Sequence, residues 1–267
     1  MEHKLSGKVV LVTGSSKGIG QGLAVGLAAV GASVAVNYKT DEAGAGITCE
    51  RIHKSGGNAE VFQADIGSKN DFERLIDQVG TRFGRLDVLV NNAARTRFAP
   101  FFEITEDDFD DVVNTNLRGP FFGSACAARK MLETGGGCII NISSIAAKMM
   151  IPFHSAYTMA KGGLEALTRQ LAYELAPAIR VNGIAPTATS SERNRGYDPD
   201  YEAKWAAITP AGRVAQVEDY VGPCVFLASD DAEMVTGQVL YVDGGWTLQA
   251  VTPDMSTADF SKDRHRG

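Results

Sequence analysis

The N-terminal thirty residues restrict the possible folds of this chain more than any other stretch. Residues 9–12 (Val-Val-Leu-Val) form an apolar, β-branched run without polar alternation, typical of a strand covered on both faces. Three glycines of the segment that follows have the spacing Gly14-x-x-x-Gly18-x-Gly20, and a helical pattern then runs to Gly31. Glycines let the backbone approach a ligand closely, and the free N–H groups at a helix start favour an anion. Strand, glycine loop and helix together predict a phosphate-binding site.

The alternation of apolar strand and helical segment continues along the chain. Alternation of this kind predicts an α/β fold with a doubly wound parallel sheet, in which ligands bind at the carboxyl ends of the strands. Pro120 lies deep within the helix predicted at 105–132 and should kink or interrupt it. Further strands are predicted at residues 33–37, 60–64, 86–90, 138–142, 184–186 and 238–242, and Gly14, Asp65, Asn91 and Ser144 all fall at strand ends.

One strand end carries residues with catalytic potential. Ser143 and Ser144 close the strand at 138–142, and Tyr157 and Lys161 follow on the next predicted helix. Residues four apart share a helix face, so the phenol and the ammonium group would be neighbours. A lysine there lowers the pKa of the tyrosine and suits it to acid–base catalysis near neutral pH. Taken alone, the stretch would be interpreted more simply as a surface Tyr and Lys; the convergence of strand ends favours a catalytic site.

The composition argues against several other classes of protein. The 267 residues carry a net charge of −6 without any basic run, which argues against a general nucleic-acid binder. The four cysteines are far apart and form no C-x-x-C pair, so neither disulfides nor a metal site are predicted. The N-terminus lacks an apolar signal core, and no apolar stretch is long enough to span a bilayer. We therefore expect a cytoplasmic protein with no membrane partner.

The end of the second strand indicates which dinucleotide the chain would bind. An Asp or Glu at this position binds the ribose 2′-hydroxyl and repels a 2′-phosphate. This chain has Asn37, followed by Tyr38 and Lys39, and Lys17 of the glycine loop would lie on the same side. Two ammonium groups and no carboxylate favour NADP, with NAD possible because Asp41 lies close by. Lys39 could instead be a solvated loop residue.

Together these residues resemble the short-chain dehydrogenase/reductase family. The resemblance covers roughly residues 8–246 and implies one Rossmann-like domain, residues 1–247, built as a three-layer sandwich around a mainly parallel seven-stranded sheet. It also implies hydride transfer between NAD(P) and an alcohol/carbonyl pair, and assembly as a homotetramer or homodimer. The motifs that carry it are Thr13-Gly14-x-x-x-Gly18-Ile19-Gly20, Asp65, Asn91-Asn92-Ala93, Asn116, Ser144, Tyr157-x-x-x-Lys161 and Val242-Asp243-Gly244-Gly245.

The resemblance assigns roles to single residues. Tyr157 would be the catalytic acid/base, Ser144 would hold the substrate oxygen, and Asn116 would seat a water in a proton relay. Lys161 would lower the pKa of Tyr157 and bind the nicotinamide ribose. Asp65 could accept from the adenine amino group or cap a helix. The expected cofactor-binding residues are Gly14, Ser16, Lys17, Gly18, Ile19, Gly20, Asn37, Tyr38, Lys39, Asp65, Ile66, Asn91, Ala93, Tyr157, Lys161, Pro186, Thr187 and Thr189.

Two positions depart from the family pattern. Ala94 stands where the family usually has Gly, and its methyl group would narrow the floor of the site. Thr187 follows Pro186 where the family usually has Gly, which implies a changed loop path beside the nicotinamide amide. Thr189 remains the residue expected to contact the carboxamide.

Residues 187–211 interrupt the strand–helix alternation and are rich in polar residues. A loop of this length is usually a lid or is disordered, and here it resembles the family's substrate-binding flap. If two nearby arginines face the pocket, an anionic substrate is expected; they could equally pair with surface carboxylates. His154 would shape the pocket, and Trp205 would cover a sugar ring or anchor the flap. The candidate substrate residues are Arg95, Arg97, Ala146, His154, Arg193, Arg195 and Trp205.

Three functions remain open from the sequence. The leading hypothesis is an NADP-preferring alcohol dehydrogenase or carbonyl reductase for a small polar substrate, such as a sugar, polyol or hydroxy acid. A 3-oxoacyl-thioester reductase is the alternative enzyme, and it would need an open groove and a basic patch for a carrier protein. A non-catalytic NADP-binding regulator or scaffold is the third, and the joint presence of Ser144, Tyr157, Lys161 and Asn116 argues against it. The polar extension at 248–267 could be disordered or reach a neighbouring subunit.

Overall fold

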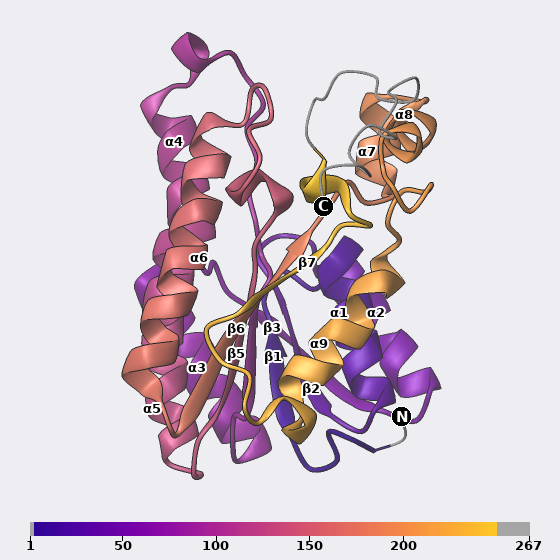
Figure 1. Cartoon of the computed structure of the whole chain (residues 1–267). Helices are drawn as coiled ribbons and strands as arrows, with labels where there is room; N and C mark the ends of the chain where they lie inside the picture. The colour runs from indigo at the N-terminus through magenta and orange to yellow at the C-terminus, as the bar shows by residue number, and fades with distance from the viewer. Residues whose placement is uncertain (1–2, 250–267) are drawn as a thin grey trace, which may run out of the picture.

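Seven parallel strands form one sheet in the order β3-β2-β1-β4-β5-β6-β7. Figure 1 shows this sheet between two layers of helices. The computed structural model describes residues 3–249, apart from the side chains of Glu192, Arg193 and Tyr197. The predicted fold class is confirmed. The strands are β1 (Val9–Val12), β2 (Ser33–Tyr38), β3 (Asn58–Gln63), β4 (Val88–Asn91), β5 (Gly137–Ile142), β6 (Ile179–Pro186) and β7 (Val239–Val242).

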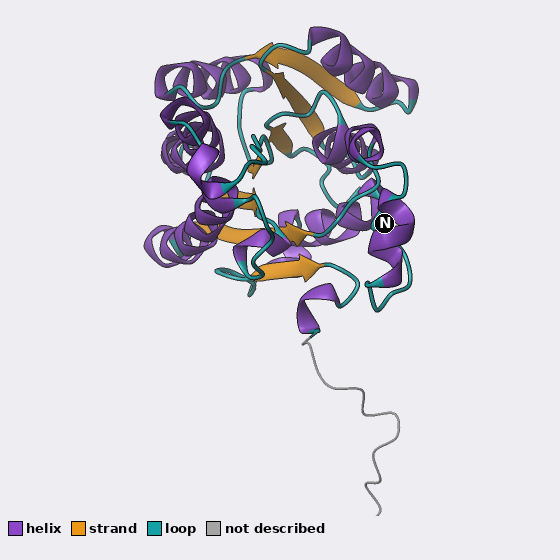
Figure 2. Ribbon diagram, turned by 90° about the horizontal axis from the view of Figure 1, so that it is seen from above, coloured by secondary structure: helices purple, strands orange, loops and turns teal. Residues whose placement is uncertain are grey.

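Helices cover both faces of this sheet, as the view from above shows (Figure 2). Helices α1, α2 and α9 lie on one face, and α3, α5 and α6 lie on the other (Figure 1). Within residues 3–249, none of the helices combines the length and the apolar character needed to cross a membrane. The helices are α1 (Gly18–Ala29), α2 (Glu42–Lys54), α3 (Lys69–Phe83), α4 (Glu106–Val113), α5 (Gly119–Leu132), α6 (Ser155–Leu175), α7 (Glu192–Tyr197), α8 (Tyr201–Ala207) and α9 (Val221–Ala228).

Strand β1 explains why the sheet needs cover on two sides. Val10 and Val12 pack into the cluster beneath α1 and α9, whereas Val9 and Leu11 pack into the cluster beneath α3 and α5. All four side chains are buried, because successive residues of a strand point to opposite faces. The apolar run without alternation is therefore the direct consequence of a doubly covered strand.

Helix α3 shows how local chemistry sets the bounds of an element. The Ser68 hydroxyl accepts from the backbone N–H of Asp71 and caps the start of the helix. Gly84 ends the helix with φ 80°, a left-handed conformation that favours glycine. Between them, Phe72 and Val79 are among the side chains that point into the core.

The helix predicted at 105–132 changes its winding partway along. After α4, residues Asn114–Arg118 form a π-helical turn, and α5 then begins at Gly119 with Pro120 in its first turn. Proline has no N–H to donate, so it is tolerated at a helix start and not in the interior. The predicted interruption therefore occurs, and it places Asn116 in the widened turn.

The segment at 187–211 is not the long loop that the sequence suggested. It contains α7 and α8, and the Ser191 hydroxyl caps α7 by accepting from the backbone N–H of Asn194. Both helices are too short for an apolar period to be visible in the sequence. Of the predicted extension at 248–267, residues 250–267 lie outside the described part of the chain.

The four cysteines are all buried, and none of them forms a disulfide. Cys49 lies on α2, Cys126 on α5, Cys138 on β5 and Cys224 on α9. Burial raises the pKa of Cys49 and of Cys138 to about 11. These thiols are core residues, as the sequence predicted by default.

Candidate active site

A cleft of about 1670 Å³ lies at the carboxyl ends of the strands, bordered by the glycine loop, the 93–98 segment and the α7–α8 segment. Its size exceeds that of a typical drug-sized pocket, so a dinucleotide and a small substrate can share it. The predicted site residues that line it are Gly14, Ser16, Lys17, Gly18, Ile19, Gly20, Asn37, Tyr38, Lys39, Asp65, Ile66, Ala93, Arg95, Ser144, Ala146, His154, Tyr157, Lys161, Pro186, Thr187, Thr189 and Trp205. The lining does not include Asn91, Arg97, Asn116 or Arg195.

The glycine loop has the shape that a pyrophosphate requires. A Cβ on Gly14 would lie 2.8 Å from Cα of Ala93, and one on Gly20 would lie 2.4 Å from the carbonyl oxygen of Gly14. Gly14 and Gly18 also have positive φ values of 60° and 57°. No side chain caps the start of α1, so its first N–H groups remain available to an anion. The loop therefore fits the phosphates of a dinucleotide.

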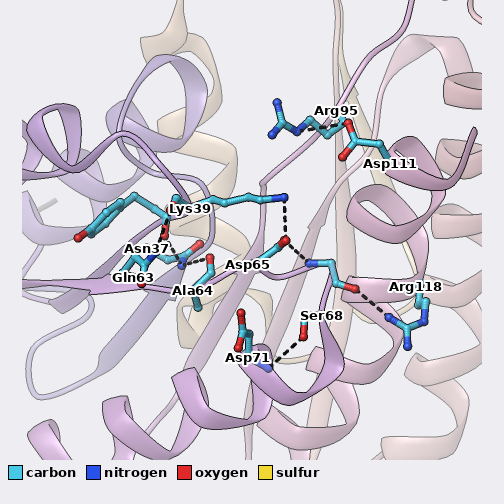
Figure 3. A network of polar contacts seen from close by, with 12 residues as sticks. Asn37, Lys39, Gln63, Ala64, Asp65, Ser68, Asp71, Arg95, Asp111 and Arg118 are labelled. Atoms are coloured by element: carbon cyan, nitrogen blue, oxygen red, sulfur yellow. Dashed lines mark hydrogen bonds and ion pairs between the residues drawn. The ribbon is translucent and has the colours of Figure 1, made fainter. Parts of the chain in front are cut away.

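Asn37 holds the glycine loop in place and does not present its side chain to a ligand. Its Oδ1 accepts from the backbone N–H of Gly14 at 3.0 Å. Its Nδ2 donates to the carbonyl oxygen of Phe62 at 3.3 Å and to that of Ala64 at 3.2 Å. Figure 3 shows Asn37 beside Ala64. The residue is almost fully buried. An aspartate here could not donate these two hydrogen bonds. Asn37 therefore links the segments that follow β1 and β3 to β2, and this position has no carboxylate to bind a ribose.

Two exposed ion pairs flank the end of β2. Lys39 Nζ lies 2.7 Å from Asp65 Oδ2, and Lys17 Nζ lies 3.9 Å from Asp41 Oδ2 (Figure 3 shows the first pair). Asp41 also caps α2 by accepting from the N–H of Gly44. Asp65 does not cap α3, since Ser68 does so; its carboxylate accepts from the N–H of Gly67. Exposed pairs of this kind contribute little stability, so both lysines can turn toward a phosphate.

The catalytic candidates converge at the other end of the cleft. Tyr157 and Lys161 share one face of α6, and Lys161 Nζ lies 5.7 Å from the centroid of the Tyr157 ring. Lys161 is 2% exposed and donates to the carbonyl oxygen of Ile142, the last residue of β5, at 2.6 Å. Burial lowers its pKa to about 8. Ser144 follows the same strand and accepts from the N–H of Ala146 at 3.1 Å. Hydroxyl, phenol and ammonium thus surround one end of the cleft.

Asn116 lies inside the protein, behind the wall of the cleft, and holds that wall by hydrogen bonds. Its side chain is fully buried and forms two hydrogen bonds of 2.8 Å with the backbone of Arg95. Oδ1 accepts from the N–H of Arg95, and Nδ2 donates to its carbonyl oxygen. The side chain of Asn116 therefore positions the segment at 94–96. The water-seating role implied by the family resemblance stays a prediction.

The side chain of Asn91, a residue predicted to line the cofactor, forms its hydrogen bonds inside the protein. Its Nδ2 donates to Asn141 Oδ1 at 2.9 Å and to Ser124 Oγ at 3.1 Å, inside the protein. The side chain thus links β4 to β5 and α5. The neighbouring Asn92 and Ala93 line the cleft in its place.

One of the four candidate arginines borders the cleft among the side chains described. That residue is Arg95, half-exposed, with Nε 3.6 Å from Asp111 Oδ2 (Figure 3). Arg97 pairs with Asp108 at 3.1 Å, and Arg195 pairs with Glu202 at 3.2 Å; neither arginine is part of the cleft lining. The side chain of Arg193 lies outside the described residues. Arg95, Arg97 and Arg195 all pair with carboxylates, which was the alternative that the sequence left open, and these three do not provide two arginines in the cleft lining.

Aromatic rings border the cleft on the side of His154 and Trp205. Trp205 on α8 packs against Tyr201 and against Trp246, with ring centroids 6.1 Å and 5.6 Å apart. His154 packs against Phe98 at 4.5 Å and turns Nδ1 to the carbonyl oxygen of Pro152 at 2.6 Å. His154 thus shapes the wall, and Trp205 both faces the cleft and anchors the flap.

Several site residues escaped sequence reasoning. Tyr220 is fully buried, its hydroxyl lies 2.8 Å from Thr189 Oγ1 and contacts the backbone of Thr187, and burial raises its pKa to about 12. Asn194 donates to the carbonyl oxygen of Thr189 at 2.9 Å. Arg51 on α2 borders the cleft beside the glycine loop. Each acts across distant segments, and no local pattern in the sequence signals such a contact.

Comparison with known proteins agrees with this geometry. The family model described as enoyl-(acyl carrier protein) reductase matches residues 14–247. A 3β-hydroxysteroid dehydrogenase of Eggerthella lenta is 38% identical over 93% of this chain and 97% of its own length. A 3-oxoacyl-(acyl-carrier-protein) reductase of Staphylococcus aureus is 37% identical over 89% of this chain and 97% of its own.

A solved structure resembles the whole fold. The gluconate 5-dehydrogenase of Burkholderia cenocepacia, in complex with NADP and tartrate, has a TM-score of 0.87 and 35% sequence identity. The similarity covers 93% of this chain and 99% of that one. A parallel dinucleotide-binding sheet with a Tyr–Lys pair in its cleft defines a class of oxidoreductases. The chain belongs to the short-chain dehydrogenase/reductase family, which confirms the family and the enzyme class predicted from the sequence.

Proposed function

We propose that the protein interconverts a secondary alcohol and a carbonyl compound with a nicotinamide dinucleotide, using Tyr157 as acid/base. The observation that carries this proposal is the buried Lys161 beside the Tyr157 ring at the end of the cleft. A buried ammonium group is costly, and it is retained most readily where its charge serves a reaction.

The residues of this chain divide the work as follows. The glycine loop and the start of α1 bind the phosphates, and Ser144 holds the substrate oxygen by a hydrogen bond. Tyr157 transfers a proton to or from that oxygen, and Lys161 favours the phenolate by its charge. When bound, the nicotinamide supplies or accepts the hydride. Asn116 keeps the 94–96 wall in position through the Arg95 backbone.

The preferred cofactor is NADP, with NAD as a weaker ligand. Three cations border the cleft near the glycine loop and the end of β2: Lys17, Lys39 and Arg51. A 2′-phosphate would take the place of Asp65 or Asp41 as the partner of a lysine. The structural neighbour that holds NADP supports this preference.

The proposed substrate is a small polar molecule such as a sugar, polyol or hydroxy acid. Ser144, His154 and Asn194 bring polar groups to the cleft. The gluconate 5-dehydrogenase among the neighbours supports this class. Arg95 is the charged group that would favour a hydroxy acid over a neutral polyol.

Replacing the acid/base tests the proposal directly. Tyr157→Phe should lower turnover by about 10²- to 10⁴-fold, because the proton-transfer group is lost while the ring is retained. Turnover is followed by absorbance of the reduced nicotinamide, in a screen of sugars, polyols, hydroxy acids, hydroxysteroids and oxoacyl thioesters with both cofactors. Calorimetry should show that the variant still binds NADP, which serves as the control for an intact cleft. Unaltered turnover would falsify the assignment.

A 3-oxoacyl-thioester reductase is the second candidate. Phe98, Ile145, Ile151 and Trp205 give the substrate end of the cleft an apolar part that could hold an acyl chain. The matched family model and the Staphylococcus aureus relative support it. Turnover of an oxoacyl thioester at least tenfold above that of any sugar or hydroxy acid would favour this candidate.

We also propose that the chain assembles as a homotetramer or homodimer. A shallow groove between α5 and α6 is lined by Phe121, Leu167 and their neighbours, and Phe121 is half-exposed. Covering such side chains favours association. Light scattering after gel filtration tests the assembly, and a monomer would contradict it. The cytoplasmic location stays a prediction.

A further inference from the structure

Glu165 is an acidic residue of α6 that lies one helical turn after Lys161, on the same face of the helix. Its Oε1 accepts from two hydroxyls, that of Ser143 at 2.9 Å and that of Tyr241 at 2.8 Å. The two donors are far apart in the sequence, because Ser143 directly follows β5 and Tyr241 belongs to β7. One carboxylate oxygen therefore joins α6 to two strands of the sheet.

The alternation of side chains along β7 explains why Tyr241 reaches α6. Leu240 and Val242 pack against the cluster beneath α1 and α9. Tyr241 lies between them in the strand, so its side chain points to the opposite face, which α6 covers. Burial and the Glu165 carboxylate raise the pKa of Tyr241. The phenol therefore stays protonated at neutral pH and can donate to Glu165.

The bond from Ser143 separates the roles of two adjacent serines. Ser143 is buried at the border of the cleft, and its backbone N–H donates to the carbonyl oxygen of Ile184 at 2.7 Å. A hydroxyl has a single proton, and Ser143 gives its proton to Glu165. Ser144 Oγ accepts from the N–H of Ala146, a bond that does not use the proton of the serine. Of the two serines, Ser144 is thus the one that can donate to a substrate oxygen.

Glu165 and Lys161 hold the same strand end from one face of α6. Lys161 Nζ donates to the carbonyl oxygen of Ile142, and Ser143 is the next residue. The separation of Ser144 from the Tyr157 phenol depends on how this strand end lies against the helix, since Ser144 follows the strand and Tyr157 belongs to α6. A misplacement of about 1 Å at a reacting group can lower a rate by about 10²-fold.

We propose that Glu165 is a positioning residue for the reaction. It binds the Ser143 hydroxyl and thereby fixes Ser144 where it can share a substrate oxygen with Tyr157. Tyr241 holds the carboxylate in place from β7. Glu165 is not part of the cleft lining, so it acts through Ser143 and not by contact with a ligand. The proposal rests on the proposed function, since it requires Ser144 and Tyr157 to act on one substrate.

Substitutions at Glu165 in the full chain test the proposal. Glu165→Leu removes the acceptor and should lower kcat by about 5- to 20-fold, with KM and NADP binding within about twofold of the parent, because the lost contact affects alignment in the transition state. Glu165→Gln keeps an oxygen that can accept from both hydroxyls, and should retain kcat within about threefold of the parent. Glu174→Leu is the control and should leave kcat unchanged, since Glu174 is an exposed residue of the same helix that accepts from Gln170.

Ser143→Ala removes the same hydrogen bond from its other side. It should lower kcat by about 3- to 20-fold, and combining it with Glu165→Leu should cause little further loss, because both changes break one contact. Thermal unfolding without ligand shows whether each variant folds. Ser143→Ala decides the proposal if Glu165→Leu does not fold.

Unchanged kcat in a folded Glu165→Leu variant would overturn the proposal. A Glu165→Gln variant as slow as the leucine variant would do the same, as would a loss of NADP binding equal to the loss of kcat. If the parent turns over none of the screened substrates with either cofactor, the proposed function itself fails, which is a different result, and the positioning role fails with it.

Discussion

The two ends of the cleft use charge in opposite ways. At the end beside the glycine loop, Lys17 and Lys39 are exposed and already paired with Asp41 and Asp65. At the reaction end, Lys161 is 2% exposed and bonds a carbonyl oxygen, with a lowered pKa that reflects its burial. The charges of Lys17 and Lys39 are therefore solvated and neutralised by carboxylates. The charge of Lys161 is single and is not screened by water.

This difference predicts where substitutions will matter. Water and salt screen the exposed pairs, so removing one partner changes binding by a small factor. A buried charge acts at low effective dielectric, so its removal has a large effect on the chemistry beside it. The buried charge also disfavours folding at pH values where it is protonated.

The largest effect is expected for Lys161→Met. Turnover should fall about 10²-fold or more, because the charge beside the Tyr157 phenol is lost.

The same buried charge also makes the free energy of unfolding of the parent depend on pH. The pKa of Lys161 is about 8 in the folded protein and 10.5 in the reference state, so between these values the unfolded chain binds more protons. The parent therefore gains stability as pH rises through this window, by about 3 kcal/mol in total.

Urea unfolding at several pH values separates the two effects of Lys161. The methionine variant lacks the titrating group, so the difference in free energy of unfolding between parent and variant should shift in favour of the parent between about pH 8 and about pH 10.5. If the free energies of unfolding of parent and variant change in parallel with pH, the Lys161 ammonium group is not desolvated, which would contradict the burial seen in the fold.

A smaller effect is expected for Lys39→Ala. NADP should bind about three- to tenfold more weakly, and NAD binding should change by less than about twofold, because only NADP carries the 2′-phosphate. The loss should shrink at high salt. Lys54→Ala is the control, since Lys54 is also an exposed lysine in an ion pair, with Glu50, and does not line the cleft. Tighter binding of NAD than of NADP by the parent would contradict the cofactor preference.

The smallest effect is expected for Arg95→Ala. The kcat/KM for a hydroxy acid should fall by about twofold to threefold relative to a matched neutral polyol, because Arg95 is half-exposed and shares its charge with Asp111. Arg97→Ala removes the same charge from a residue outside the cleft lining and provides the control. Equal discrimination by the parent and both variants would remove Arg95 from substrate recognition.

Sequence reasoning succeeded where the information is local. The apolar strand at 9–12 and the glycine loop carry their structure in a few residues. The shared face of Tyr157 and Lys161 follows from helix geometry alone. It failed where a side chain chooses between distant partners: Asn37 and Asn91 are correct in position, but their amides are used inside the protein.

The flap at residues 187–211 is a second region where contacts between distant residues decide the structure. Its polar composition predicted a loop, and the two short helices that form there are stabilised by contacts such as Trp205 with Trp246, forty-one positions away. Arg195 pairs with Glu202 one helix further on, a choice that depends on how α7 meets α8. Nothing in the sequence around Tyr220 indicates that its hydroxyl forms a hydrogen bond with Thr189.

The four buried cysteines give the protein an internal reporter. A thiol reagent attacks the thiolate, and burial together with a raised pKa makes that species scarce in the folded state. Because Cys49 and Cys224 lie under one face of the sheet and Cys126 under the other, labelling of all four requires both halves of the core to open. The rate of thiol labelling, with and without NADP, would therefore measure how far a ligand in the cleft slows opening of each half, with no engineered cysteine needed.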